Sequence, residues 1–205
     1  MKRNIPFFSV LAEAQTYLNI VYIFFAFPLS ILYFSLVIAG ISLSIGLVFI
    51  VIGFFVFLAV LMMLRGFRWL DVELTRVFLG KTIHAGIMQE KHQGFTPFLK
   101  RYFGSSLSWK LLVYYLFVKF PLDTVIWSFT ITFIAITFNL LLSPVLQQYI
   151  WYDDEITHWL IDFFGDVYVL PFMGIIWGMI SLHVIRGLAW VSGELNVIFL
   201  QDSKK

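Results

Sequence analysis

The residues best suited to chemistry in this sequence are two opposite charges inside an apolar segment. Lys119 and Asp123 lie four residues apart in the otherwise apolar run 111–142, so a helix places them on one face. Charges inside a membrane are costly and mark a functional site by default, which favours a ligand or proton site. A structural ion pair is the competing interpretation, because the long lysine stem can carry its charge toward the membrane surface.

Five further polar residues are candidates for binding. His183 precedes Arg186 by three residues, where it could titrate near neutral pH or form a hydrogen bond between helices. Arg65 and Arg186 are each followed eight residues later by a glutamate, Glu73 and Glu194 respectively. Arginine at a membrane surface meets anionic headgroups, and an ion pair of these arginines with these glutamates, within or between the two segments, is a second interpretation.

No metal, cofactor or catalytic site is expected. Asp153, Asp154 and Glu155 with His158 are weak metal candidates, because carboxylates suit calcium or magnesium and histidine suits zinc. No calcium-loop spacing accompanies them, so a solvated acidic loop is favoured. Cysteine is absent, which excludes thiolate ligands and nucleophiles. Without a Gly-x-Ser-x-Gly, His-Glu-x-x-His or phosphate-loop motif, the sequence predicts a protein that is not an enzyme.

Composition identifies the environment of these residues. The 205-residue chain is 60% hydrophobic and only 13% charged, whereas soluble domains carry about 25% charged residues. The net charge of +2 gives no basis for nucleic-acid binding. Spanning helices need about 20 apolar residues, and the runs 17–40, 43–64, 111–142 and 169–185 meet this requirement. We therefore predict an all-α polytopic membrane protein with a tight turn at 39–42 and an end to the third span at Pro144.

Amphipathic segments surround the spans. Residues 65–110 are predicted to form two short interfacial helices, and residues 186–205 a C-terminal amphipathic helix. The arginines and lysines lie in the N-terminus, the 65–110 linker and the C-terminus, Lys119 excepted, whereas the loop 143–168 is acidic. Because positive loops stay in the cytoplasm, we expect a plasma-membrane protein with both termini cytoplasmic.

The sequence repeats itself. Arg65-Gly66, Trp69, Glu73-Leu74 and Val77-Phe78-Leu79 recur with the same spacing as Arg186-Gly187, Trp190, Glu194-Leu195 and Ile198-Phe199-Leu200, and Tyr22 with Phe27-Pro28-Leu29 recurs as Tyr115 with Phe120-Pro121-Leu122. Such self-similarity predicts two tandem helical hairpins. We place the first with its linker in residues 1–107 and the second, with its acidic outer loop, in residues 108–205.

These residues resemble a known family. The stretches Ala14–Gly46, 65–80 (RGFRWLDVELTRVFLG) and 108–129 (SWKLLVYYLFVKFPLDTVIWSF) are similar to the putative sensor domain found at the membrane end of actinobacterial and archaeal histidine kinases and in stand-alone proteins. The resemblance implies two hairpins with a proline inside spans one and three. No phospho-acceptor segment or nucleotide-binding glycine box follows, so it implies the sensor module alone, and it carries over no ligand residues.

Three functions fit this sequence. The leading one is a non-enzymatic sensor-type module that passes a membrane or ligand signal to a separate partner. The second is a lipid-binding or structural accessory subunit of a membrane complex. The third is a small transporter or channel acting as an oligomer, although one charged pair makes a poor pore. The expected partners are membrane lipids and either another protein or further copies of the chain.

Overall fold

The structure is a computed structural model that describes residues 10–83, 99, 102–149, 162–163 and 167–201. Every regular element in these ranges is helical. The long helices are α1 (Ala14–Gly46), α2 (Ile52–Leu79), α5 (Phe120–Tyr149) and α7 (Leu170–Leu200), and the short ones are η2 (Val48–Ile50), α4 (Ser106–Val113), the π-helical turn η3 (Tyr114–Lys119) and η4 (Val167–Val169). The expected all-α class is confirmed.

Four helical stretches of the described chain are long and apolar enough to cross a membrane. They are α1, α2, the continuous run Ser106–Leu146 through α4, η3 and α5, and α7, with lengths of 33, 28, 41 and 31 residues. At 1.5 Å of rise per residue, each exceeds the roughly 30 Å thickness of a bilayer's hydrocarbon core. The chain is therefore a multi-pass membrane protein.

The predicted turn at 39–42 is wrong. Helix α1 runs through these residues to Gly46, and the chain reverses at residues 47–51, where Val51 takes a left-handed backbone conformation with φ of 63°. Gly40 is small because a side chain there would collide with Val60 of α2. The small residue is therefore needed for helix contact, and Ser44 closes the hairpin by donating a hydrogen bond to the Gly53 carbonyl at 2.7 Å.

Pro144 does not end the third span. Helix α5 continues to Tyr149, although a proline within a helix leaves the carbonyl four residues earlier without its N–H partner. That carbonyl belongs to Leu140, and the Ser143 hydroxyl donates to it at 2.9 Å. The neighbouring serine replaces the lost backbone bond, so the helix tolerates the proline.

Separate amphipathic helices after Arg65 and Arg186 are also wrong. Helix α2 continues through Arg65 to Leu79, and α7 continues through Arg186 to Leu200. Some of their polar side chains, including Asp71 and Asn196, are buried in the protein rather than on a membrane surface. The remaining part of the expected interfacial region, residues 84–98, lies outside the described residues.

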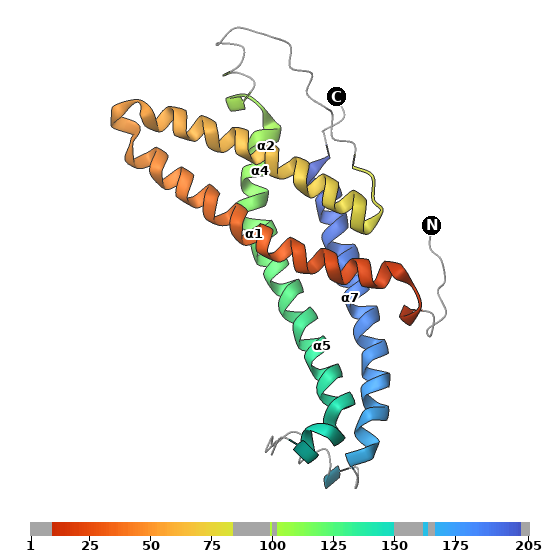
Figure 1. The fold of residues 1–205 in the computed structure, drawn as a ribbon. Coiled ribbons are helices and arrows are strands. Elements are labelled where there is room, and N and C mark those ends of the chain that lie inside the picture. Colours follow the sequence, from red (N-terminus) through yellow and green to blue (C-terminus); the bar gives the residue numbers. More distant parts are fainter. Residues whose placement is uncertain (1–9, 84–98, 100–101, 150–161, 164–166, 202–205) are drawn as a thin grey trace.

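The helices pair as two hairpins, α1 with α2 and α5 with α7. Figure 1 shows the two hairpins crossing at a large angle. The second hairpin meets the first with α4, the start of α5 and the end of α7, across the middle of α1 and α2 and the half away from the turn at 47–51. The hairpins separate toward that turn and toward the far end of α5. We call the end of each hairpin that lies away from its turn the open end. In the first hairpin this is the end with the start of α1 and the end of α2, and in the second the end with α4 and the end of α7. A core at the crossing combines both hairpins, with Tyr33 stacked on Phe67 at 4.2 Å and edge-on to Tyr115 at 5.2 Å.

The tip of the first hairpin gives a test of its packing. A side chain at Gly53 would approach the Leu47 carbonyl carbon and the Val48 nitrogen to 2.7 Å, and backbone cannot easily move away. We expect Gly53→Ala to lower the free energy of unfolding in detergent by about 1–3 kcal/mol, as overpacked sites do. Gly46→Ala is the control, because nothing lies within 4 Å of that position. Equal stability of the two variants would contradict this packing.

Candidate functional site

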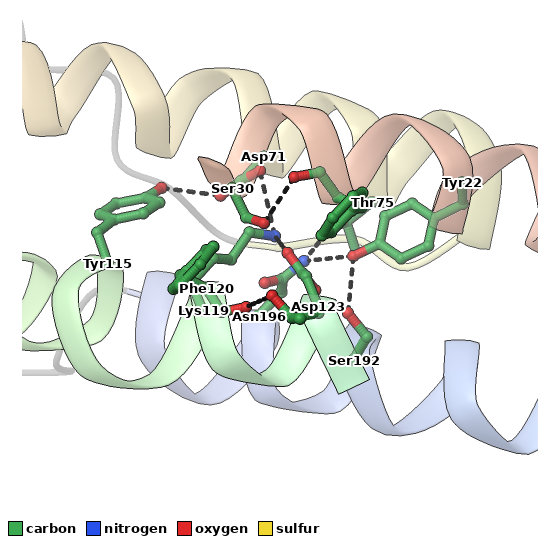
Figure 2. Close-up of polar contacts among 12 residues, drawn as sticks. Tyr22, Ser30, Asp71, Thr75, Tyr115, Lys119, Phe120, Asp123, Ser192 and Asn196 are labelled. Carbon is green, nitrogen blue, oxygen red and sulfur yellow. Dashed lines mark hydrogen bonds and ion pairs between the residues drawn. The ribbon is translucent and has the colours of Figure 1, made fainter. Parts of the chain in front are cut away.

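A buried lysine between two aspartates forms the centre of the candidate site (Figure 2). The Lys119 amine lies 3.4 Å from Asp71 Oδ1 and 3.3 Å from Asp123 Oδ2. The side chains of Lys119 and Asp71 are each 1% exposed and that of Asp123 is 3% exposed. Asp71 comes from α2, whereas Lys119 and Asp123 come from η3 and α5. The pair of Lys119 with Asp71 therefore joins the first hairpin to the second, whereas its pair with Asp123 lies within one helical run.

The π-helical turn η3 positions the lysine. In an α-helix, residues five apart point about 140° away from each other, but a π-helical turn bonds residues five apart and brings them closer to one face. Tyr114, Tyr115 and Lys119 are consequently all buried. Pro121 is the second residue after this turn and has no N–H to donate to residue 117, which favours the widened turn.

Hydroxyl and amide groups extend the site on both sides. Tyr115 donates a hydrogen bond to Asp71 Oδ2 at 2.9 Å. The Asn196 amide nitrogen of α7 donates to Tyr22 Oη and Thr75 Oγ1, both at 2.9 Å, and its oxygen accepts from Tyr114. We call the residues of Figure 2 that share these contacts the polar network: Tyr22, Asp71, Thr75, Tyr114, Tyr115, Lys119, Asp123, Ser192 and Asn196.

The network holds buried charge. Two carboxylates face one ammonium group, and Lys119 is the cation with which both carboxylates pair in the described structure. A charge buried without a partner costs several kcal/mol, so the stability of the arrangement depends on which of the two acids is ionised. The described residues contain no cluster of histidine and acidic side chains able to hold a metal ion.

The structure brings together only two of the residues expected from the sequence. The expected contact between Lys119 and Asp123 is present, whereas His183 contacts the Met179 carbonyl of its own helix at 2.8 Å. The weak metal candidates Asp153, Asp154, Glu155 and His158 lie outside the described residues.

The two arginines and two glutamates of the repeat take other partners. Glu73 pairs with Arg76 and Glu194 with Lys81, both at 2.9 Å, and Arg186 pairs with Glu13. Arg65 lies over the Tyr102 ring and donates to Ser108 at 3.4 Å. Several of these contacts join the two hairpins, but none pairs one of the expected arginines with one of the expected glutamates.

Sequence reasoning missed Asp71 and Asn196. Both stand in segments that we expected to lie on the membrane surface, where a polar side chain needs no explanation. A usable signal was present, because each occurs beside apolar residues in the same helical register that continues from the preceding span. A continuous helix would have placed Asp71, Thr75 and the serine and asparagine of α7 inside the protein.

Fold and site define a helical membrane protein with a charged network buried between two hairpins. A family model described as Putative sensor matches residues 22–200. The chain belongs to this sensor family, as its resemblance predicted. No curated protein and no solved structure matches the chain.

Removing the buried amine tests how strongly the site stabilises the fold. We expect Lys119→Met to lower the free energy of unfolding in detergent by about 3–5 kcal/mol, because the aspartates lose their shared counterion. Arg76→Met removes a cation from an exposed pair with Glu73 and is expected to cost at most about 1 kcal/mol. The double variant Lys119→Met with Asp71→Asn should recover part of the loss, and failure to recover any would contradict an electrostatic cause.

Proposed function

We propose that this chain is a non-enzymatic membrane sensor module that passes a membrane or ligand signal to a separate protein. Membership of the sensor family supports a sensor-type role. The observation that carries the proposal is the polar network, because it places buried charges at the crossing of the two hairpins, whose turn ends lie apart. A stimulus that alters this junction would alter the angle between the hairpins. In this proposal the module lies in the plasma membrane with its open end in the cytoplasm.

We further propose that the hairpins are tandem repeats that exchange equivalent contacts. By the register of the sequence repeat, Tyr22 corresponds to Tyr115 and Asp71 corresponds to Ser192. The hydroxyl of Tyr115 reaches Asp71, and that of Tyr22 lies 3.1 Å from Ser192. Each tyrosine of a first span thus contacts the second span of the other hairpin. A junction built from two such equivalent contacts suits a hinge between two rigid units.

The surface proposed for the partner lies at the open end. Trp69 and Val77 of α2 are exposed, and so are Trp190 and Ile198 of α7 at the corresponding repeat positions. Tryptophans at this depth also suit the membrane surface. Side chains eight residues apart share a helix face, so each helix presents an aromatic and an aliphatic group on one stripe. A partner that grips both stripes would respond to the angle between the hairpins.

The hinge can be measured with two spin labels. The chain has no cysteine, so introduced cysteines can be labelled selectively. Suitable positions are Ile45→Cys near the end of α1 and Phe172→Cys near the start of α7, which are both exposed. We expect Asn196→Leu, which removes bonds to Tyr22, Thr75 and Tyr114, to shift or broaden the distance distribution between these labels in liposomes. Leu36→Cys with Phe55→Cys, both within the first hairpin, is the control pair and should not change. An unchanged distance distribution between the labels at positions 45 and 172 would contradict the proposed hinge.

The partner surface can be tested by native mass spectrometry after gentle extraction from the original membranes. We expect a second protein in fixed stoichiometry, and its loss in the double variant Val77→Arg with Ile198→Arg. Phe49→Arg is the control, because Phe49 is exposed at the opposite end of the first hairpin. A chain that carries no other protein would count against a signalling module.

A second function is favoured by one specific observation, an apolar groove of about 400 Å³ between the start of α1 and the α5–α7 hairpin. Its walls include Ile20, Phe138, Ile175 and Leu182, with few polar atoms. The groove suits an acyl chain, so an accessory lipid-binding subunit is the alternative. In the same native mass spectrum, a retained lipid without a protein partner would favour this alternative.

A further inference from the structure

We propose that the Asp71–Lys119–Asp123 triad binds one proton, which Asp123 carries. The proposal does not depend on a signalling role for the chain, because it follows from charge and geometry alone. No part of it requires a ligand other than a proton taken from water.

The triad contains two acidic groups and one ammonium group. Both carboxylates lie within ion-pair distance of the same amine, at 3.4 and 3.3 Å, so their oxygens can be no farther apart than the sum of these distances. Two ionised carboxylates beside one ammonium group would leave a net negative charge in a site that water barely reaches. Like charges this close, in a low dielectric, favour protonation of one member. One bound proton makes the triad neutral.

The two aspartates differ in the hydrogen bonds that they accept. Asp71 is well stabilised as a carboxylate, because it pairs with Lys119 and accepts a hydrogen bond from Tyr115 at 2.9 Å. Asp123 Oδ2 is buried and lies 3.3 Å from Lys119, and no second donor, such as the tyrosine that contacts Asp71, reaches it. The less stabilised acid takes the proton, so Asp123 is the neutral member.

The groups around the triad leave this balance unchanged. Besides the two aspartates and the lysine, the titratable side chains near it are tyrosines, which are neutral in ordinary conditions. Asn196, Thr75 and Ser192 do not titrate. Arg68 of α2 donates its Nε–H to the Leu200 carbonyl at 2.8 Å, and the described ion pairs of the aspartates are with Lys119 alone. By element, the neighbours are Tyr22 and Tyr33 from α1, Asp71 and Thr75 from α2, Tyr114, Tyr115 and Lys119 from η3, and Ser192 and Asn196 from α7.

Loss of the proton would act on the contact between the hairpins. Asp71 belongs to the first hairpin, and Asp123 to the second. With both acids ionised, they repel each other and share a single counterion. Release of the proton therefore weakens the junction, and its uptake strengthens it. The triad is thus a site through which proton binding is linked to the approach of the two hairpins.

Infrared difference spectroscopy of the full chain in liposomes detects the proton directly. A protonated carboxyl group has a C=O stretch that is distinct from the carboxylate bands, and aspartate labelled with carbon-13 at the carboxyl group identifies its source. We expect a buried aspartic-acid band in the wild type at neutral pH, and its loss in Asp123→Asn. Asparagine is close in shape to the neutral acid, so this variant should elute and fold as the wild type does.

Asp71→Asn gives an independent test, because one remaining carboxylate can pair with Lys119 without a proton. We expect the band to disappear in this variant too. Asp162→Asn is the matched control, since Asp162 is exposed, and it should keep the band. Absence of the band in the wild type would overturn the proposal, and so would its persistence in either Asp123→Asn or Asp71→Asn.

Discussion

The arrangement of this protein depends on keeping one ammonium group, that of Lys119, inside a helical membrane protein. A lipid-facing lysine at that depth would be costly, and burial without a partner would cost about as much. The chain places one aspartate from each hairpin beside the lysine. Because the two acidic groups come from different hairpins, satisfying the lysine also helps to determine where the hairpins cross. The neighbouring tyrosines and Asn196 complete the hydrogen bonds that the same crossing buries.

An irregular helical turn allows Lys119 to be buried beside the two aspartates. A proline in the third span removes one backbone donor, the preceding turn widens, and three polar side chains come to share a buried face. Serine compensates for a second proline further along α5. In a bilayer, each backbone group must find a partner within the protein, so these irregular turns are tolerated only where side chains or the other hairpin replace the lost bonds. The irregular turn and the polar network therefore depend on each other, because the turn supplies three of the buried polar side chains.

Apolar length predicted four spanning helices, helical spacing predicted the Lys119–Asp123 contact, and the resemblance of three stretches predicted the family. They could not locate the helix ends. Gly40 resembles a turn residue in sequence, but its role is to admit Val60 of the neighbouring helix, and such a contact is invisible without the partner helix. Asp71 was missed for the same reason. A polar residue beyond an apolar span has the same sequence signature whether it faces water or a buried lysine on another hairpin, and only the crossing of the hairpins distinguishes the two.

Contacts between the two hairpins are unevenly distributed along their length. At the open end the hairpins share ion pairs, hydrogen bonds and aromatic contacts, whereas their tips are apart (Figure 1). Within this shared, largely apolar contact, the polar network is the part that a single protonation can change, because it contains the buried charges. Within each hairpin, close contacts at Gly53 and Gly174 bind the helix pairs tightly. A small change in charge at the network therefore acts on the relation between two units that are each held together by close packing, and this is the property that a membrane sensor requires.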